Sequence, residues 1–190
     1  FFVLLPIMLL NALPAFAQLE AKHLVQFKQE DGVPASEVDA LLNDSNGFLW
    51  LGTINGLARY DGYEFKRFVH DPNDSSSINV SLISALFEDS HGNIWIGSNG
   101  AVDVYDPLTR SFQHLDFSHL MDDSENRTLF ISCFIEDSQG RIFMGINDSY
   151  FREFIGALLY YDKLSGTIQR YPIPKGLVIK NIFDLCIDDH

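Results

Sequence analysis

The sequence predicts an all-β protein, and three observations lead to this prediction. Aromatic side chains, which favour strands, make up 13% of the chain. Short apolar runs alternate with turn segments rich in Gly, Asn and Asp, as expected for antiparallel strands. One turn-and-strand segment also occurs three times, at residues 44–52 (DSNGFLWLG), 89–97 (DSHGNIWIG) and 137–145 (DSQGRIFMG).

The composition limits the class of protein further. Of the 190 residues, 46% are hydrophobic and 21% are charged, which supports a buried core in one domain or a small pair of domains. The formal net charge of -13 argues against a nucleic acid or an anionic membrane surface as the main partner, because both repel an acidic domain. The 2 cysteines are too few for a disulfide scaffold.

Residues 1–17 are predicted to be a signal peptide. They carry no charge, begin with an apolar run and end in the small-x-small pattern AFA at 15–17, so cleavage is expected before Gln18. A transmembrane helix is the alternative. The run is shorter than the roughly 20 residues that a bilayer requires, and Pro6, Asn11 and Pro14 interrupt it. We therefore expect export. The missing initial Met and basic segment, and a last stretch at 185–190 (LCIDDH) that resembles the middle of a strand, predict a fragment at both ends, from the N-terminal part of a longer protein.

Residues 18–36 are expected to contribute a strand before the first repeat. Residues 23–27 (HLVQF) resemble 65–69 (FKRFV) and 168–171 (IQRY), which follow the first and third copies. Such a strand would allow a ring of repeats to close by pairing the first segment with the last unit, which removes an exposed sheet edge.

Each repeat is predicted to form four antiparallel strands. In the second copy we expect strands at residues 81–88, 93–97, 101–105 and 111–115, separated by turns that contain Gly or Pro. Two further marks recur with each copy. They are an apolar residue before the first Asp (Val38, Ile83 and Ile131) and a Tyr-Asp pair after it (60–61, 105–106 and 161–162).

A β-propeller is the architecture that this repeat predicts. Residues 94–96 (IWI) are apolar at every position, so both faces of the strand need cover, which stacked meanders provide. Four strands in a unit of about 45 residues are typical of a propeller blade. The repeats predict blade 1 at 37–76, blade 2 at 77–126, blade 3 at 127–176 and the start of a fourth blade at 177–190. Propellers contain about four to eight blades, so this incomplete ring is expected to belong to a longer protein.

Large side chains at one repeat position are expected to fill the space between neighbouring units. These are Trp50, Trp95 and Phe143, for which a stacking platform for sugars is the less favoured alternative. The turn glycines are expected to close hairpins. The complete set of structural repeat residues is Asp44, Gly47, Trp50, Gly52, Asp89, Gly92, Trp95, Gly97, Asp137, Gly140, Phe143 and Gly145.

At residues 41–62 and 86–98 the sequence resembles the two-component regulator propeller repeats. The motif of that family is an apolar strand, Asp-x-x-Gly-x-Leu-Trp-Ile-Gly-Thr, a turn, Gly-Leu and Tyr-Asp. It corresponds here to residues 44–53 (DSNGFLWLGT), 56–57 (GL) and 60–61 (YD). The third copy departs from the motif, because Phe143 replaces Trp and residues 147–156 are inserted. The resemblance covers roughly residues 23–190.

The resemblance implies a periplasmic sensor. In that family the propellers lie outside the inner membrane, and a β-sandwich, a membrane helix and a cytoplasmic output domain follow them. The output is commonly a histidine kinase, often a hybrid one, and in other members a diguanylate cyclase. The implied partner is a glycan or another small extracellular ligand, with membrane attachment through downstream sequence and homodimerisation of the full-length protein. An exported lyase or hydrolase and a scaffold for protein partners are the alternative functions.

The chain shows no motif for catalysis or for a cofactor. Gly-x-Ser-x-Gly, His-Glu-x-x-His, P-loop and Cys-x-x-Cys patterns do not occur, so no catalytic residue, cofactor or metal is predicted. His114 and His119 are assigned to a solvated loop. Acidic residues at 122, 123 and 125 offer oxygen ligands of the kind that Ca²⁺ prefers, but a solvated loop is favoured there too. Cys133 and Cys186 are expected to be buried, with a disulfide as the less favoured alternative.

A ligand face is expected where the turns after the second strands and the connections between blades emerge. This prediction selects Asn55 and Asn99, together with the insertion after residue 147. In the insertion, Tyr150 is expected to stack on a sugar and Arg152 to hold a carboxylate, with a loop of no binding role as the alternative.

Overall fold

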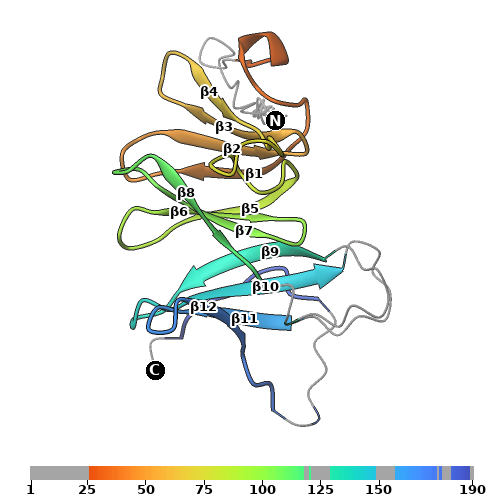
Figure 1. Ribbon diagram of the computed structural model, residues 1–190, viewed down its shortest axis with the longest axis vertical. Helices are drawn as coiled ribbons and strands as arrows, with labels where there is room; N and C mark the ends of the chain where they lie inside the picture. Colours follow the sequence, from red (N-terminus) through yellow and green to blue (C-terminus); the bar gives the residue numbers. More distant parts are fainter. Residues whose placement is uncertain are drawn as a thin grey trace, which may run out of the picture.

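The computed structural model describes residues 26–117, 120, 129–148, 157–174, 176 and 181–188, and these contain three four-stranded sheets (Figure 1). The first sheet, blade 1, contains β1 (Val38–Asn43), β2 (Leu49–Thr53), β3 (Gly56–Tyr60) and β4 (Phe65–Phe68). Blade 2 contains β5 (Ile83–Glu88), β6 (Ile94–Ser98), β7 (Val102–Asp106) and β8 (Ser111–Leu115). Blade 3 contains β9 (Leu129–Glu136), β10 (Ile142–Asp148), β11 (Ala157–Asp162) and β12 (Thr167–Arg170).

Each sheet is an antiparallel meander in which the strands pair in chain order. The all-β prediction and the four-stranded repeat are therefore confirmed. In blade 2 the four expected strands occur within two residues of their predicted bounds. A short 3-10 helix, η2 (Gln29–Asp31), precedes the first sheet.

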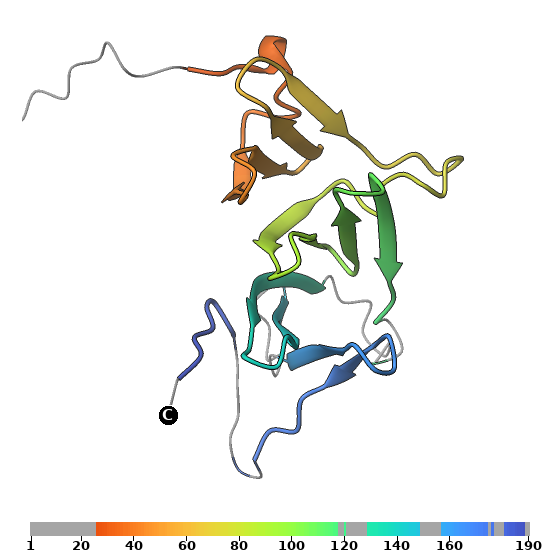
Figure 2. The same cartoon turned by 90° about the vertical axis from the view of Figure 1, so that its left-hand side faces the viewer.

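The three sheets lie one after another along the longest axis of the molecule (Figures 1 and 2). The first strand of each sheet is an edge strand, and it lies against the first strand of its neighbour: β1 contacts β5, and β5 contacts β9. These strands are the inner strands of propeller blades, while β4, β8 and β12 form the outer edges. The described residues form an arc of three blades and not a closed ring.

Apolar side chains fill the seams between blades. In the seam between blades 1 and 2, Trp50 and Leu57 of blade 1 pack against Ile83, Ile94 and Tyr105 of blade 2. The next seam is built in the same way, and its buried members include Trp95, Val102, Ile131, Ile142 and Met144. Trp50 and Trp95 are 1% and 3% exposed, so these rings pack inside the protein and present almost no surface to a ligand.

A glycine in the second strand of each blade allows the next blade to approach closely. A Cβ atom added at Gly52 would lie 2.6 Å from Cγ2 of Ile83, the first residue of β5. Real Cβ atoms essentially never come so close to another side chain. The same approach, also at 2.6 Å, recurs for Gly97 with Ile131 and for Gly145 with Ile182.

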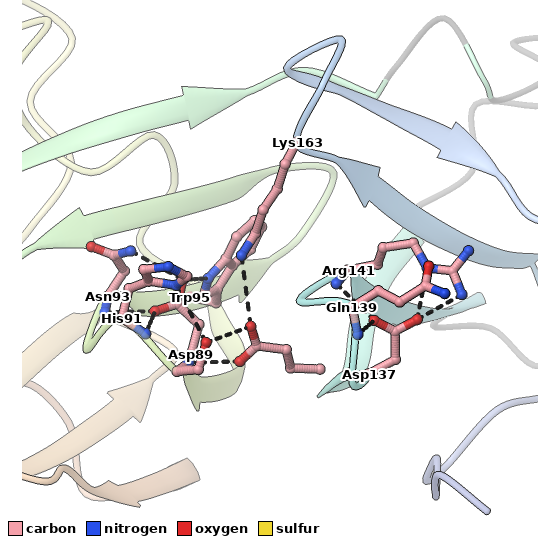
Figure 3. A network of polar contacts seen from close by, with 10 residues as sticks. Asp89, His91, Asn93, Trp95, Asp137, Gln139, Arg141 and Lys163 are labelled. Carbon is pink, nitrogen blue, oxygen red and sulfur yellow. Dashed lines mark hydrogen bonds and ion pairs between the residues drawn. The ribbon is translucent and has the colours of Figure 1, made fainter.

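The first Asp of each repeat organises the turn that follows it (Figure 3). Oδ1 of Asp89 accepts hydrogen bonds from the backbone N–H groups of His91 and Asn93, both at 2.9 Å. Its Oδ2 accepts from Trp95 Nε1 at 3.0 Å and from the Asn93 side chain at 3.0 Å. Burial raises the pKa of Asp89, but the four hydrogen bonds outweigh it and hold the pKa below its usual value. Asp44 makes the same bonds to Trp50 and to the turn backbone.

The third repeat keeps this Asp without the Trp. The Phe143 side chain has no N–H group, and Arg141 supplies the donors instead. Its Nε and Nη2 lie 2.7 Å and 2.6 Å from Asp137 Oδ2 (Figure 3). The same guanidinium lies 5.3 Å from the centre of the Phe143 ring. A carboxylate that would otherwise lose a donor is thus satisfied by a different side chain.

Hydrogen bonds also join neighbouring blades at this end. The backbone N–H and the hydroxyl of Ser90 donate to the two carboxylate oxygens of Glu136 at 2.6 and 2.8 Å. Ser45 donates in the same way to Glu88, at 2.7 and 2.5 Å. The Ser of the Asp-Ser-x-Gly turn therefore holds the Glu that ends the first strand of the following blade.

Parts of the chain outside the three sheets bear on further predictions. Residues 1–25, which include the predicted signal peptide, lie outside the described residues. Of the predicted strand 23–27, residues 26 and 27 are described and are not in a strand; Phe27 packs 4.8 Å from Tyr60 and 5.1 Å from Phe65 of blade 1, measured between ring centres. A role in closing a ring stays a prediction. Among the described residues, no helix has the length and apolar character needed to span a membrane.

The cysteines differ from expectation in one respect. Both Cys133 and Cys186 are free, and Cys133 is partly buried. The expectation that Cys186 is buried is wrong, because it is exposed. Four residues before it, Ile182 is 8% exposed, although this segment forms no strand in the described residues.

Candidate functional site: the crossover face

One end of the blades carries the turns between second and third strands and the connections from one blade to the next. β2 and β4 are both antiparallel to β3, so their last residues lie at the same end of the sheet. We call this end the crossover face. The Asp-Ser-x-Gly turns lie at the opposite end, since they connect first and second strands.

Asn55 and Asn99 both lie on the crossover face, in different settings. Asn55 is exposed, and its backbone N–H donates to Thr53 Oγ1 at 3.1 Å. Asn99 is partly buried, and its backbone pairs with Phe130 at the start of blade 3. Asn55 is thus the more accessible of the two, while Asn99 sits at a seam.

The insertion of the third blade begins at a contact with the segment that follows this blade in the chain. Asn147 is buried, and its side chain donates to the carbonyl oxygen of Ile182 and accepts from the N–H of the same residue, both at 2.7 Å. Tyr150 and Arg152 lie outside the described residues, so their binding role stays a prediction.

The crossover from blade 1 to blade 2, residues 69–82, is fastened to blade 2 by polar contacts. The carboxylate of Asp103 on β7 is fully buried and lies 2.7 Å from Nδ1 of His114 on β8. Its other oxygen accepts from the backbone N–H of Asn79 at 2.7 Å. Nε2 of His114 lies 3.0 Å from the carbonyl oxygen of Ser75. One buried carboxylate and one imidazole therefore hold two points of the crossover.

The environment shifts both pKa values in the same direction. Burial raises the pKa of Asp103 and outweighs the opposing hydrogen bonds. Burial lowers the pKa of His114, but the hydrogen bonds to Asp103 and to the Ser75 carbonyl prevail, and the pKa is raised. Each group therefore holds its proton to a higher pH than it would in water.

The pair is not arranged as a catalytic dyad. In a nucleophilic site the imidazole nitrogen opposite the carboxylate takes a proton from a nucleophile. Here that nitrogen, Nε2 of His114, faces a backbone carbonyl, which has no proton to give. The prediction that His114 lies in a solvated loop is wrong, because it is part of β8.

A hollow of about 390 Å³ lies between the crossover and His114. Its lining is mixed, and its polar members include His70, Asp71, Asp74 and Asn79. Within the described ranges, no three His, Cys, Asp or Glu side chains gather as metal ligands would. The acidic residues at 122, 123 and 125 are outside those ranges.

Sequence reasoning missed Asp103 and its partners. One signal was present: Asp103 is the one charged residue among apolar neighbours in residues 101–105 (AVDVY). A lone carboxylate in an apolar strand predicts a buried, paired group. The partners Ser75 and Asn79 are distant in sequence and could not be identified from spacing.

Comparison with known proteins supports the repeat and the fold. The family model of the two component regulator propeller matches residues 32–55 and 77–100. A histidine kinase P4 of Formosa agariphila is 42% identical over 53 residues, which are 28% of this chain and 4% of that protein.

Solved structures share the arrangement of blades. The extracellular domain of the hybrid two component system BT3049 from B. thetaiotaomicron has a TM-score of 0.67 at 20% identity, over 84% of this chain and 22% of that one. The extracellular domain of the one component system BT4673 from the same organism also has a TM-score of 0.67 at 20% identity, over 90% and 22%. The chain thus spans about a fifth of the length of these structures. Residues 32–55 and 77–100 thus match the repeat of the two-component regulator propeller family, and the sheets that contain them are blades of a propeller.

Proposed function

We propose that this chain is the extracytoplasmic, ligand-sensing part of a membrane signal-transduction protein whose output is a histidine kinase. The observation that carries the proposal is the family repeat in blades 1 and 2, together with the 42% identity to a histidine kinase over 53 residues. The extracellular location of the similar two component system structures favours a position outside the membrane.

The crossover face favours binding over catalysis. Its most buried titratable pair is Asp103 and His114, and both nitrogens of that imidazole already have acceptors. The exposed amide of Asn55, and the hollow beside His114 with Asn73 and Asn79 in its lining, suit a ligand that carries hydroxyl groups, because amide side chains offer both donors and acceptors. A glycan fragment is the ligand class we propose.

The enzymatic output of the full-length protein tests whether it is a histidine kinase sensor. In membranes that contain the whole protein, we expect phosphate transfer from ATP to a histidine of the protein, and a change in its rate when a mixture of oligosaccharides is added from outside. The oligosaccharides should be recovered intact. Formation of cyclic di-GMP would instead assign a diguanylate cyclase, and cleavage of the oligosaccharides an enzyme.

The position of the ligand is tested by alanine variants of the full-length protein. We expect Asn55→Ala with Asn99→Ala, or Tyr150→Ala with Arg152→Ala, to weaken oligosaccharide binding about thirtyfold, since each of the two lost contacts is worth roughly 1 kcal/mol. Tyr63→Ala is the matched control, because this 94% exposed aromatic residue lies at the opposite end of blade 1. Equal weakening by Tyr63→Ala, or none by either pair, would contradict the assignment of the crossover face.

A further inference from the structure

Asp103 and His114 interrupt the repeat at one row of the sheet. The register that pairs Ile96, Asp103 and His114 across β6, β7 and β8 has equivalents in the other blades. Those rows are Leu51, Ala58 and Arg67 in blade 1, and Met144, Leu159 and Arg170 in blade 3. The buried carboxylate therefore replaces an apolar side chain.

A blade does not require this carboxylate. Ala58 and Leu159 are fully buried at the equivalent positions, as is Asp103. Burying a charged pair carries a desolvation cost even when its hydrogen bonds are made, and the apolar residues of the other two blades avoid that cost. In blade 2, Asp103 and His114 hold the crossover that precedes the blade.

The hydrogen-bond geometry requires a proton between the two side chains. An ionised carboxylate and a backbone carbonyl only accept hydrogen bonds. Nε2 of His114 must carry a proton to bond the Ser75 carbonyl at 3.0 Å, and a second proton must lie between Nδ1 and Asp103 Oδ1, 2.7 Å apart. When that second proton is lost, only one of the two His114 ring nitrogens carries a hydrogen. The lone pair of the other nitrogen then faces the Asp103 carboxylate or the Ser75 carbonyl, and that hydrogen bond is lost.

We propose that Asp103 and His114 form a proton-dependent latch, which holds residues 75–79 of the crossover against blade 2 and releases them when the shared proton is lost. Within the described residues, the crossover contributes His70, Asp71 and Asp74 to the hollow that His114 also lines, and the charge of His70 acts on Asp103. His70 is itself bonded to the Ile78 carbonyl at 2.9 Å. Because the crossover forms part of the ligand face, the latch makes the shape of that face depend on pH.

The direction of the effect follows from the raised pKa of His114. A group whose pKa is higher in the folded state stabilises that state at low pH, and this contribution disappears as the pH rises through the folded-state pKa. The latch is therefore closed in acidic solution and opens as the pH rises above the ordinary range of histidine.

Hydrogen exchange of the full-length protein tests the latch. After correction for intrinsic exchange rates, we expect protection of the peptide containing Asn79 to fall about tenfold or more between pH 6 and pH 9. His114→Arg introduces the residue found in blades 1 and 3, whose charge is permanent, and should keep the protection at both pH values. His114→Gln should show the low protection at both.

Two controls make the outcome decisive. Protection of β6 must stay constant with pH in every variant, which shows that the blade itself remains folded. Asp103→Leu introduces the side chain of blade 3 and should lose protection only in the crossover. Constant protection around Asn79 in the unmodified protein, or the same pH dependence in His114→Arg, would overturn the proposal.

Discussion

Replacement of Trp95 by alanine is expected to lower the free energy of unfolding by about 4 kcal/mol, within the range of large-to-small core substitutions. The Trp95 side chain is buried (3% exposed), and its ring centre lies 5.3 Å from that of Tyr161 and 6.2 Å from that of Phe134, both in blade 3. Its removal therefore leaves a cavity in the seam. It also removes one of the four hydrogen bonds to the Asp89 carboxylate. Urea denaturation of the purified protein, followed by circular dichroism, measures the loss.

Trp95→Phe separates the hydrogen bond from the packing. Phenylalanine keeps an aromatic ring but cannot donate to Asp89, so we expect a loss of about 2 kcal/mol. Adding Asn93→Arg copies the arrangement of Arg141 and Phe143 in blade 3 and should restore part of the loss. A double variant that is less stable than Trp95→Phe would show that the guanidinium does not replace the indole N–H in this seam.

The effect of Trp95→Phe should also depend on pH. The pKa of Asp89 is held low in the folded protein, so its hydrogen bonds stabilise the fold above the ordinary pKa and lose that effect as the pH falls through the folded-state value. The difference in stability between the unmodified protein and Trp95→Phe should therefore shrink below a pH of about 4. A difference that stays constant down to acid unfolding would argue against a charged acceptor.

Gly52→Ala is expected to destabilise the protein by about 3 kcal/mol through overpacking. The new Cβ would lie 2.6 Å from Ile83 Cγ2 and 3.1 Å from Ala40 Cβ, so blades 1 and 2 would have to separate. Equilibrium denaturation measures the change. Gly47→Ala is the control: it meets nothing within 4 Å, and its φ of 84° should cost only about 1 kcal/mol.

A double-mutant cycle assigns the strain at Gly52 to the seam. Ile83→Ala removes Cγ2, the atom nearest to the new methyl group. Gly52→Ala combined with Ile83→Ala should therefore be more stable than the sum of the two single losses predicts, by about 1 kcal/mol or more. Additive losses would place the cause of the destabilisation elsewhere.

The second copy showed its four strands because turns with Gly or Pro bound each apolar run, and hairpins depend on local chemistry. The glycines at 52, 97 and 145 were recognised as part of the motif, but their purpose was not, because the side chain that fills each space belongs to the next repeat. The sequence likewise does not indicate the role of Arg141, which is to donate hydrogen bonds to Asp137 beside the Phe143 ring.

The strands, their order in each sheet and the presence of equivalent blades are predictable from the residues alone. These features follow from local turn chemistry, from apolar patterning and from a motif that recurs along the chain. Which groups meet across a seam or under a crossover is visible only in the folded protein. Asp103 and His114 come together because β7 and β8 are paired, and the Asn79 amide reaches them only when the crossover folds back. Such contacts depend on how the blades and the crossover pack together, because they join residues that are distant in sequence.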